Sequence, residues 1–354
     1  MSSRSIHTLP LITDPLPANR LLTMPMSGPL VDTFGRVHDH IRISVTDRCN
    51  LRCTYCMPED VTFQPTETLL RFDEIERMVR IGIDLGITQV RLTGGEPLLR
   101  KNLPELVARL MRIPGLADLA LTTNGMLLPE LARPLADAGL PRLNVSLDTL
   151  DPVRFRKLAR RDGLERVLEG LTIAQSCGFR SIKLNAVAIR NFSEPDLPAL
   201  ATYARKQGFE LRFIEYMPIG AEPWDRAQML SAQAIQSILE SEFGRLTPIP
   251  DADPHAPAQE FAYADGQGRV GFIASVTQPF CRRCDRIRLT ADGKLRNCLF
   301  ALEETDIRPW LQPDSDPAQL QLLIRQSVWA KWEGHEINSA RFVRPDRTMH
   351  AIGG

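Results

Sequence analysis

The stretch Cys49-Asn50-Leu51-Arg52-Cys53-Thr54-Tyr55-Cys56 determines how this 354-residue chain is interpreted. Three and then two residues separate its cysteines, which follow the alternating run Ile41-Arg42-Ile43-Ser44-Val45, and this run predicts a β-strand. Three thiolates are one short of the four that close a zinc or iron–sulfur site. If they hold a 4Fe–4S cluster, one iron keeps an open position, which is a catalytic arrangement. The alternatives are a zinc site completed by a distant ligand, or three unrelated thiols.

Composition limits the classes of protein to which the chain can belong. Apolar residues make up 43% and charged residues 24%, as in an ordinary globular protein. No apolar run approaches the ~20 residues of a membrane span. The formal net charge is zero, with 43 basic and 43 acidic side chains, so nucleic acid is not an evident partner. Six of the seven cysteines fall into two groups of three. We therefore expect metal clusters in a reducing cytoplasm rather than disulfides.

Changes in composition suggest three regions. Residues 1–30 hold five prolines and show no sustained helical or strand period, which predicts a disordered or loosely docked extension. Prolines gather again between residues 248 and 257, and we place a domain boundary near residue 245. The expected domains are therefore 31–245 and 246–354.

Six predicted strands alternate with helical patterns in the first domain. One helical face is formed by Ile75, Met78, Val79, Gly82 and Ile83. This alternation predicts an α/β fold with parallel strands and right-handed crossovers, hence a (β/α)6 barrel or an incomplete one. A doubly wound open sheet is the alternative. The predicted strands are residues 41–47, 89–93, 119–123, 143–147, 183–189 and 210–217.

Polar and glycine-rich residues follow the ends of these strands. Gly94-Gly95-Glu96-Pro97 follows the second strand, Thr122-Thr123-Asn124 ends the third, Ser146 and Asp148 end the fourth, and Met217 ends the sixth. Taken singly, each is turn or capping chemistry. In a parallel barrel, however, the carboxyl ends of the strands form the active site, so together they predict a cofactor cradle at the same barrel mouth as the cysteine loop.

The second domain carries another set of three cysteines. Two hairpins are predicted, around Asp265-Gly266 and Asp292-Gly293. Cys281, Cys284 and Cys298 have spacings that suit three-quarters of a zinc ribbon as well as an open iron–sulfur site. Four arginines surround them, and Arg286 and Arg288 should project on the same face of a strand. Arginine suits bidentate phosphate binding, so this region suggests a nucleotide substrate, with a solvated charged strand as the alternative.

The cysteine motif after a first strand resembles the signature of the radical S-adenosylmethionine (SAM) enzymes. With both cysteine sets placed, the chain from about residue 31 onwards resembles the GTP 3′,8-cyclases, the family that begins molybdenum cofactor biosynthesis. The motifs that carry this resemblance are residues 32–36, 47–58, 91–100, 144–148 and 211–215, Arg42, the second cysteine set and the terminal Gly353-Gly354.

The resemblance implies an incomplete (β/α)6 barrel closed by a C-terminal domain with a second 4Fe–4S cluster. It implies that a reduced first cluster cleaves SAM to a 5′-deoxyadenosyl radical, which abstracts the 3′ hydrogen of GTP. The implied site residues are Cys49, Cys53 and Cys56 for the first cluster; Tyr55, Gly95, Ser146 and Met217 for SAM; Arg42, Arg91, Thr122, Lys183, Arg286, Ile287 and Arg288 for GTP; and Cys281, Cys284 and Cys298 for the second cluster. The two arginines of the 286–288 run and the first three cysteines are the expected catalytic residues.

The resemblance also implies partners. These are GTP, an electron donor for the first cluster, and the next enzyme of the pathway, cyclic pyranopterin monophosphate synthase, as product acceptor. The sequence does not decide the oligomeric state, and a homodimer is compatible with it. Gly353-Gly354 resembles a tail that enters the barrel mouth, although a frayed end is the base expectation. Cys177 is interpreted as a small buried hydrophobe.

Two other function classes remain open from the sequence. One is a radical SAM peptide maturase with an auxiliary cluster, although such enzymes often carry more cysteines in the C-terminal region. The other is a non-enzymatic protein that uses both cysteine sets as structural zinc sites.

Overall fold

The computed structural model describes residues 23–220, 223–250 and 255–354, so most of the predicted N-terminal extension lies outside the described residues. The described residues contain one twelve-stranded sheet with the order β12-β11-β10-β1-β2-β3-β4-β5-β6-β9-β8-β7. Its strands are β1 (His40–Ser44), β2 (Gln89–Thr93), β3 (Asp118–Thr123), β4 (Arg142–Ser146), β5 (Ser181–Ala188), β6 (Glu210–Glu215), β7 (Thr247–Pro248), β8 (Gln259–Ala262), β9 (Arg269–Ile273), β10 (Arg286–Leu289), β11 (Lys294–Arg296) and β12 (Thr305–Asp306).

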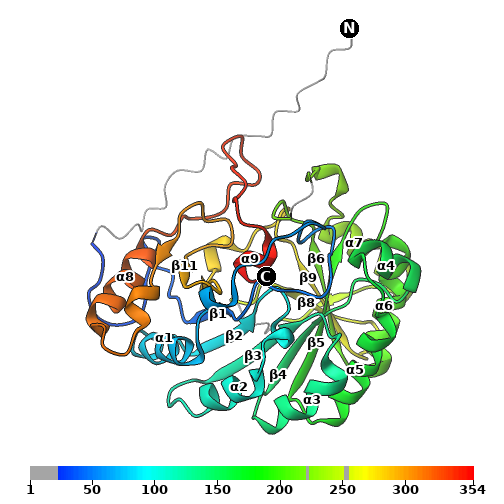
Figure 1. Ribbon diagram of the computed structural model, residues 1–354. Helices are drawn as coiled ribbons and strands as arrows, with labels where there is room; N and C mark the ends of the chain where they lie inside the picture. The colour runs from blue at the N-terminus through cyan, green and yellow to red at the C-terminus, as the bar shows by residue number, and fades with distance from the viewer. Residues whose placement is uncertain (1–22, 221–222, 251–254) are drawn as a thin grey trace.

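Helices connect the parallel strands. In Figure 1, α2, α3, α5 and α6 lie outside the strands, while α9 and the C-terminus lie over the middle of the sheet. The helices are α1 (Phe72–Asp84), α2 (Leu103–Met111), α3 (Leu128–Asp137), α4 (Pro152–Ala159), α5 (Leu164–Ser176), α6 (Leu197–Gln207), α7 (Ala232–Phe243), α8 (Pro317–Trp329) and α9 (Met349–Ile352).

The order of the strands confirms the barrel-type prediction. Strands β1 to β6 correspond to the six predicted strands, and each pairs in parallel with the next one along the chain. A doubly wound sheet would reverse its strand order at a switch point, and no reversal occurs among β1–β6. The sheet therefore curls as a partial barrel.

Both predicted hairpins form, and each contributes a strand to the barrel. β8 pairs antiparallel with β9, and β10 with β11. In addition, β9 pairs in parallel with β6, and β10 with β1. The parallel part therefore has eight strands rather than the predicted six. β9 and β10 are not neighbours in the sheet, so the barrel stays open.

Side-chain alternation places apolar residues outside and polar residues inside the partial barrel. On β1, Ile41 and Ile43 are fully buried in the main apolar core, whereas Arg42 between them points to the opposite face. The predicted face of α1 packs against this core, with Ile75, Met78 and Val79 buried. The helix starts with a capping box, in which Glu74 accepts a 2.6 Å hydrogen bond from the backbone N–H of Arg71.

One apolar core serves both predicted domains. Its buried members run from Leu30 to Val328. A small second cluster is formed by Ile219, Met229, Val276, Phe300 and Ile337. Chain packing begins before residue 31, because Leu30 is fully buried and Arg325 donates hydrogen bonds to the carbonyls of Gly28 and Pro29.

No helix within the described residues is both long and apolar enough to cross a bilayer.

Candidate active site

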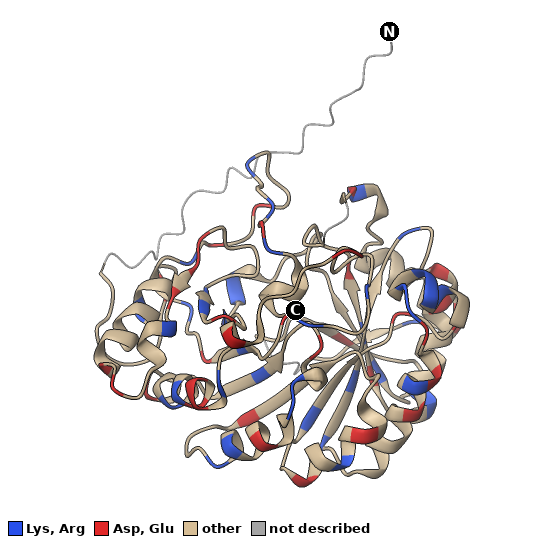
Figure 2. Ribbon diagram, viewed as in Figure 1, with Lys and Arg blue, Asp and Glu red and all other residues tan. Residues whose placement is uncertain are grey.

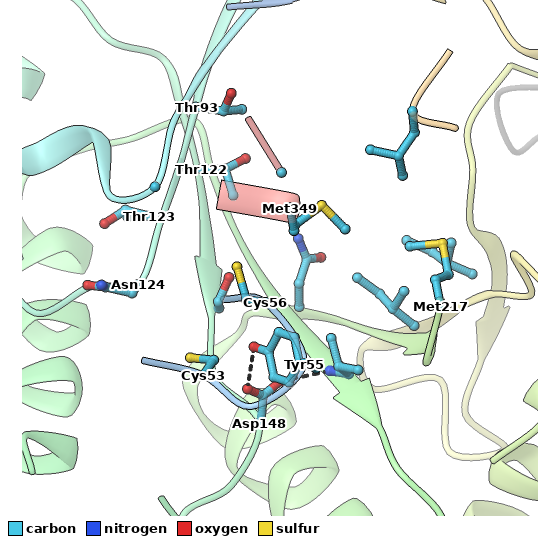
Figure 3. A pocket seen from close by; sticks show the side chains of 18 of the residues that line it. Cys53, Tyr55, Cys56, Thr93, Thr122, Thr123, Asn124, Asp148, Met217 and Met349 are labelled. Atoms are coloured by element: carbon cyan, nitrogen blue, oxygen red, sulfur yellow. Dashed lines mark hydrogen bonds between the residues drawn. The ribbon is translucent and has the colours of Figure 1, made fainter. Parts of the chain in front are cut away.

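A cavity of about 240 Å³ opens at the carboxyl ends of the parallel strands. Its wall is built from the strand ends, the cysteine loop and the C-terminal tail (Figure 3). The predicted site residues that line it are Arg42, Cys49, Cys53, Tyr55, Cys56, Arg91, Gly95, Thr122, Ser146, Met217 and Arg288. Lys183, Arg286, Ile287, Cys281, Cys284 and Cys298 are not among its lining residues.

The first three cysteines face this cavity from a loop that is fixed to α4. Arg52 and Thr54 donate backbone hydrogen bonds of 2.9 and 3.0 Å to the carbonyls of Ala159 and Leu158. Cys49 Sγ accepts a 3.4 Å hydrogen bond from the N–H of Leu51, and Asn124 Nδ2 lies 3.7 Å away. These hydrogen bonds hold the backbone that carries the three thiols in place.

The chemistry of these thiols fits iron ligation. Burial raises the pKa of Cys49 to about 11 and that of Cys56 to about 12, and it raises the pKa of Cys53 well above its ordinary value. Buried thiolates are unfavourable here without a cation, and a bound metal ion supplies that charge. Within the described ranges, no three His, Cys, Asp or Glu side chains gather closely enough to hold one metal ion. The three thiols would supply a 4Fe–4S cluster with three of its four protein ligands.

The glycine motif after β2 is packed against the start of the cysteine loop. A Cβ on Gly94 would lie 2.5 Å from the carbonyl oxygen of Thr46, and one on Gly95 would lie 2.5 Å from those of Asp47 and Arg48. The N–H of Gly95 also donates to Thr46 over 2.8 Å. Besides lining the cavity, these glycines allow the β2 turn and the cysteine loop to approach each other closely.

Glu96 braces the next turn. It is almost fully buried, and its carboxylate accepts hydrogen bonds from the N–H of Leu98 (2.9 Å), the hydroxyl of Thr123 (2.7 Å) and the N–H of Asn124 (2.7 Å). Burial raises the pKa of Glu96 to about 7, although these hydrogen bonds oppose the rise. The ends of β2 and β3 are thereby held together.

Tyr55 reaches across the cavity to the end of β4. Its hydroxyl donates a 2.8 Å hydrogen bond to Asp148, which also accepts one from the N–H of Val187 at 2.8 Å (Figure 3). Burial raises the pKa of Asp148 to about 6 despite both hydrogen bonds. The ring of Tyr55 is thus fixed beside Cys53 and Cys56.

Arginines form a row across the barrel interior. The strand register pairs Arg42 of β1 with Arg288 of β10 on one side and with Arg91 of β2 on the other. Figure 2 shows basic residues on the strands themselves as well as on the outer helices. The Nε atoms of Arg42 and Arg91 are buried without a hydrogen-bond partner within the described residues. Such a row is unfavourable unless an anion joins it.

Burial and like charges also perturb these groups. They lower the pKa of Arg42 well below its usual range, that of Arg91 to about 9 and that of Arg288 to about 10. Arg91 and Arg288 therefore still carry positive charge near neutral pH. The row is therefore a cationic surface facing the cavity.

The other predicted GTP residues lie apart from the cavity lining. Lys183 Nζ forms a 2.8 Å ion pair with Glu210. Arg286 lies 3.1 Å from Asp285 and stacks on Phe280. Ile287 is buried in the main core, on the opposite face of β10 from the arginines, so its side chain does not face the barrel interior.

Sequence reasoning missed several residues of the cavity. Asn185, Arg212, Glu215 and Met349 all line it. A signal existed for Arg212, because a cation within the apolar run of β6 marks an inward position. Glu215 accepts hydrogen bonds from the N–H groups of Ala232, Val276 and Thr277, each 2.8–2.9 Å long, and so ties β6 to the following loops.

The C-terminal tail enters the barrel mouth, as predicted. Gly354 lines the cavity, and the carbonyl of Gly353 accepts a 2.7 Å hydrogen bond from Arg288. Gly353 has φ +90°, and a Cβ there would lie 2.8 Å from Ser44 and Thr93. Glycine is required at this position by both conformation and space.

The second cysteine set flanks the β10–β11 hairpin, since Cys281 and Cys284 precede β10 and Cys298 follows β11. Cys298 Sγ accepts a 3.4 Å hydrogen bond from the N–H of Phe300. Burial raises the pKa of Cys281 to about 11. Burial also acts to raise the pKa of Cys284, but Lys331 and Arg286 outweigh it and lower that pKa to about 7. The cations beside Cys284 favour its thiolate, which is the form that ligates a metal. Cys177 is buried in the main core, as predicted.

Sequence comparisons give the family. The model of the Radical SAM superfamily matches residues 43–204, and that of Molybdenum Cofactor Synthesis C matches residues 209–337. The chain is 49% identical over 330 residues to a GTP 3′,8-cyclase of Rhodopirellula baltica, covering 92% of each chain. It is 46% identical over 338 residues to GTP 3′,8-cyclase 2 of Mycobacterium tuberculosis, covering 94% of each chain.

Solved structures agree on the fold. SuiB of Streptococcus suis bound to S-adenosylmethionine superposes with a TM-score of 0.56 at 16% identity, over 84% of this chain and 68% of that chain. At this identity the likeness concerns the fold alone.

The partial barrel with three cysteines at its mouth, together with these matches, defines a member of the radical SAM superfamily. Membership implies a 4Fe–4S cluster and SAM as cofactors. Within the superfamily, the chain belongs to the GTP 3′,8-cyclase family.

Proposed function

We propose that the chain converts GTP to (8S)-3′,8-cyclo-7,8-dihydroguanosine 5′-triphosphate, the first step of molybdenum cofactor biosynthesis. The observation that carries this proposal is the arginine row, which shares one cavity with the three-cysteine loop and in which the Nε atoms of Arg42 and Arg91 are buried without a hydrogen-bond partner within the described residues. A triphosphate supplies the anion that the row lacks, and a radical enzyme needs its substrate beside its first cluster. The identity to named cyclases over nearly the whole chain supports the same substrate.

The first cluster and SAM would be held at the cysteine loop. Cys49, Cys53 and Cys56 would each ligate one iron, while Tyr55, Gly95, Ser146 and Met217 would contact SAM. When bound, the cluster and SAM supply a carbon-centred radical that can abstract a hydrogen atom from the substrate. The protein itself holds the loop rigid through α4, encloses the cavity and keeps the Tyr55 ring in place through Asp148.

The arginine row would bind the triphosphate of GTP. Hydrogen bonds between charged groups contribute about 1.5–3 kcal/mol each, and guanidinium groups present paired N–H donors to phosphate oxygens. Arg42, Arg91 and Arg288 already face the cavity. Thr122 lines the cavity as well. Lys183, Arg286 and the Ile287 backbone are not among the lining residues, and we propose that they contact parts of GTP that extend beyond the cavity.

The second cluster would be bound by Cys281, Cys284 and Cys298. Three thiolates would again leave one iron open, and we propose that this iron meets the guanine base. Leu299 lines the cavity, so Cys298 is adjacent in sequence to a residue of the proposed substrate space. We retain residues 31–245 and 246–354 as the proposed domains.

The proposed reaction also calls for two partners and a reducing compartment. The first cluster requires an external electron donor, and the product requires an acceptor, proposed as cyclic pyranopterin monophosphate synthase. A homodimer is compatible with these roles. Because both cysteine sets need reduced thiols, we propose the cytoplasm as the compartment.

The test is an anaerobic reconstitution with iron and sulfide, followed by addition of dithionite, SAM and GTP. Mass spectrometry should detect 5′-deoxyadenosine together with a cyclised isomer of GTP, and Cys281→Ser should lose the isomer. Formation of 5′-deoxyadenosine with GTP unchanged would support radical SAM chemistry but exclude GTP as the substrate. That result would favour the peptide maturase alternative. Zinc in place of iron, with neither product, would support the structural zinc alternative.

A further inference from the structure

Lys331 is a buried cation beside the second cysteine set, and the proposed reaction gives it no role. The residue is 4% exposed. Its Nζ lies 2.8 Å from the carbonyl oxygen of Arg286, 3.4 Å from His38 Nδ1 and 3.5 Å from Cys284 Sγ. Within the described chain, Lys331 contacts no carboxylate. A buried ammonium group needs a nearby anion, and the sulfur is the one contact that can become an anion.

The imidazole of His38 is fixed as a hydrogen-bond acceptor for Lys331. His38 is fully buried, and its Nε2 lies 3.0 Å from Asp32 Oδ2. Burial, followed by the charge of Lys331, lowers the pKa of His38 to about 4, so the ring is neutral near pH 7. Nε2–H therefore donates to Asp32 and leaves Nδ1 free to accept from Lys331. The 2.8 and 3.4 Å contacts of the ammonium group are therefore with neutral acceptors. Its two remaining contacts are both with Cys284, whose carbonyl oxygen and Sγ each lie 3.5 Å from Nζ.

The segment before β1 also fixes the backbone on both sides of this contact. Arg36 donates 2.6 Å hydrogen bonds to the carbonyls of Cys281, Trp332 and Glu333. It is itself held by Asp32, 2.5 Å from Arg36 Nε. The cysteine turn and the residues after Lys331 are thus joined to one anchor. This arrangement holds Lys331 Nζ at a set distance from the sulfur.

We infer that Lys331 is a positioning residue for the second cluster, with its ammonium group neutralising the Cys284 thiolate once that sulfur ligates iron. The inference rests on the proposed function, because the second cluster is part of that proposal. Removing the cation would disfavour the more negative, reduced state of the cluster, so its midpoint potential would become more negative. Changes around metal ligands also weaken metal binding by about 10- to 100-fold.

The test uses the full chain with Cys49, Cys53 and Cys56 replaced by alanine, so that only the second set can hold a cluster. Lys331→Met, Lys331→Gln and Lys331→Arg are compared with this parent after anaerobic reconstitution. Lys294→Met is the matched control, because Lys294 forms a surface ion pair of 2.6 Å with Asp306. The readouts are iron retained against a chelator and the midpoint potential followed by electron paramagnetic resonance.

Lys331→Met should lose its iron at about 10- to 100-fold lower chelator concentration and show a more negative potential, whereas Lys331→Arg and Lys294→Met should stay near the parent. Lys331→Gln keeps an N–H donor but lacks the charge. It should therefore show the same loss of iron and the same shift in potential, and it replaces Lys331→Met in the test if the methionine variant does not fold. The same chelator sensitivity and potential in the neutral variants and the parent would overturn the role of Lys331. A parent that binds no iron would overturn the second cluster itself, and the role of Lys331 with it.

Discussion

Replacing Arg42 with methionine should stabilise the protein and weaken GTP binding. Arg42 lies between Arg91 and Arg288 in the strand register, and its Nε is buried without a partner within the described residues. Methionine fills a similar space and removes the like-charge repulsion. An unsatisfied buried polar group costs about 1–3 kcal/mol. Because the rest of the guanidinium faces the cavity, we expect a gain in unfolding free energy near the lower end, about 1 kcal/mol.

The loss of GTP affinity follows from the same geometry. A hydrogen bond to a charged group contributes about 1.5–3 kcal/mol, which corresponds to about a 10- to 150-fold higher Kd at 1.4 kcal/mol per factor of ten. Urea denaturation of the GTP-free protein and anaerobic titration calorimetry with GTP measure the two effects. SAM affinity should be unchanged.

Arg296→Met is the matched control for this experiment. Arg296 is also buried, with 2% of its side chain exposed, but it is paired with Glu304 and is not among the cavity-lining residues. Breaking a buried pair costs about 3–5 kcal/mol, so this variant should lose stability and keep its GTP affinity. If Arg42→Met lost stability as Arg296→Met does, or bound GTP as tightly as the wild type, the arginine row would not be an unfilled anion site.

Four further outcomes follow from the site. Gly95→Ala would place a Cβ 2.5 Å from two backbone oxygens of the cysteine loop, so it should cost about 1–3 kcal/mol of stability and lower iron retention at the first set; unchanged urea midpoint and iron content would contradict this close approach. Because the pKa of Glu96 is raised from 4.5 to about 7, its stabilising contribution in the metal-free protein is complete below pH 4.5 and disappears as the pH rises through 7. The difference in urea midpoint between wild type and Glu96→Gln should therefore change across this window, and a constant difference would show that Glu96 does not titrate there. Deleting Gly353-Gly354 removes the carbonyl that Arg288 contacts, so cyclised product should be lost while circular dichroism stays unchanged; full turnover would remove the role of the tail. Arg286→Ala should weaken GTP binding while SAM binding survives, and an unchanged GTP affinity by calorimetry would exclude Arg286 from the substrate site.

The sequence predicted the parts of the fold that depend on local patterns. Alternation in runs such as Ile41–Val45 reflects one apolar and one polar face, so β1 to β6 were predictable in type and in order. The two hairpins were predictable because Asp-Gly between alternating runs is a local signal for a tight turn. That β9 joins β6 and β10 joins β1 was not predictable, because a hairpin signal is local and the choice of a third neighbour depends on distant chain segments.

The site was predictable where the residues form motifs or resemble the family. The first cysteines and the glycine turn meet at one cavity, as expected. Residue type alone did not show that Lys183 pairs with Glu210 on the neighbouring strand, because that contact depends on the strand register. Lys331 was missed because nothing in the local sequence links it to Asp32 and His38, about three hundred residues earlier in the chain.

The most direct test of the cyclase assignment uses GTP labelled with deuterium at the ribose 3′ carbon. The reconstituted protein is incubated anaerobically with dithionite and SAM, and the 5′-deoxyadenosine formed is examined by mass spectrometry. If the radical abstracts the 3′ hydrogen of GTP bound on the arginine row, 5′-deoxyadenosine should carry deuterium in step with formation of the cyclised GTP isomer. Unlabelled 5′-deoxyadenosine with intact GTP would contradict the assignment.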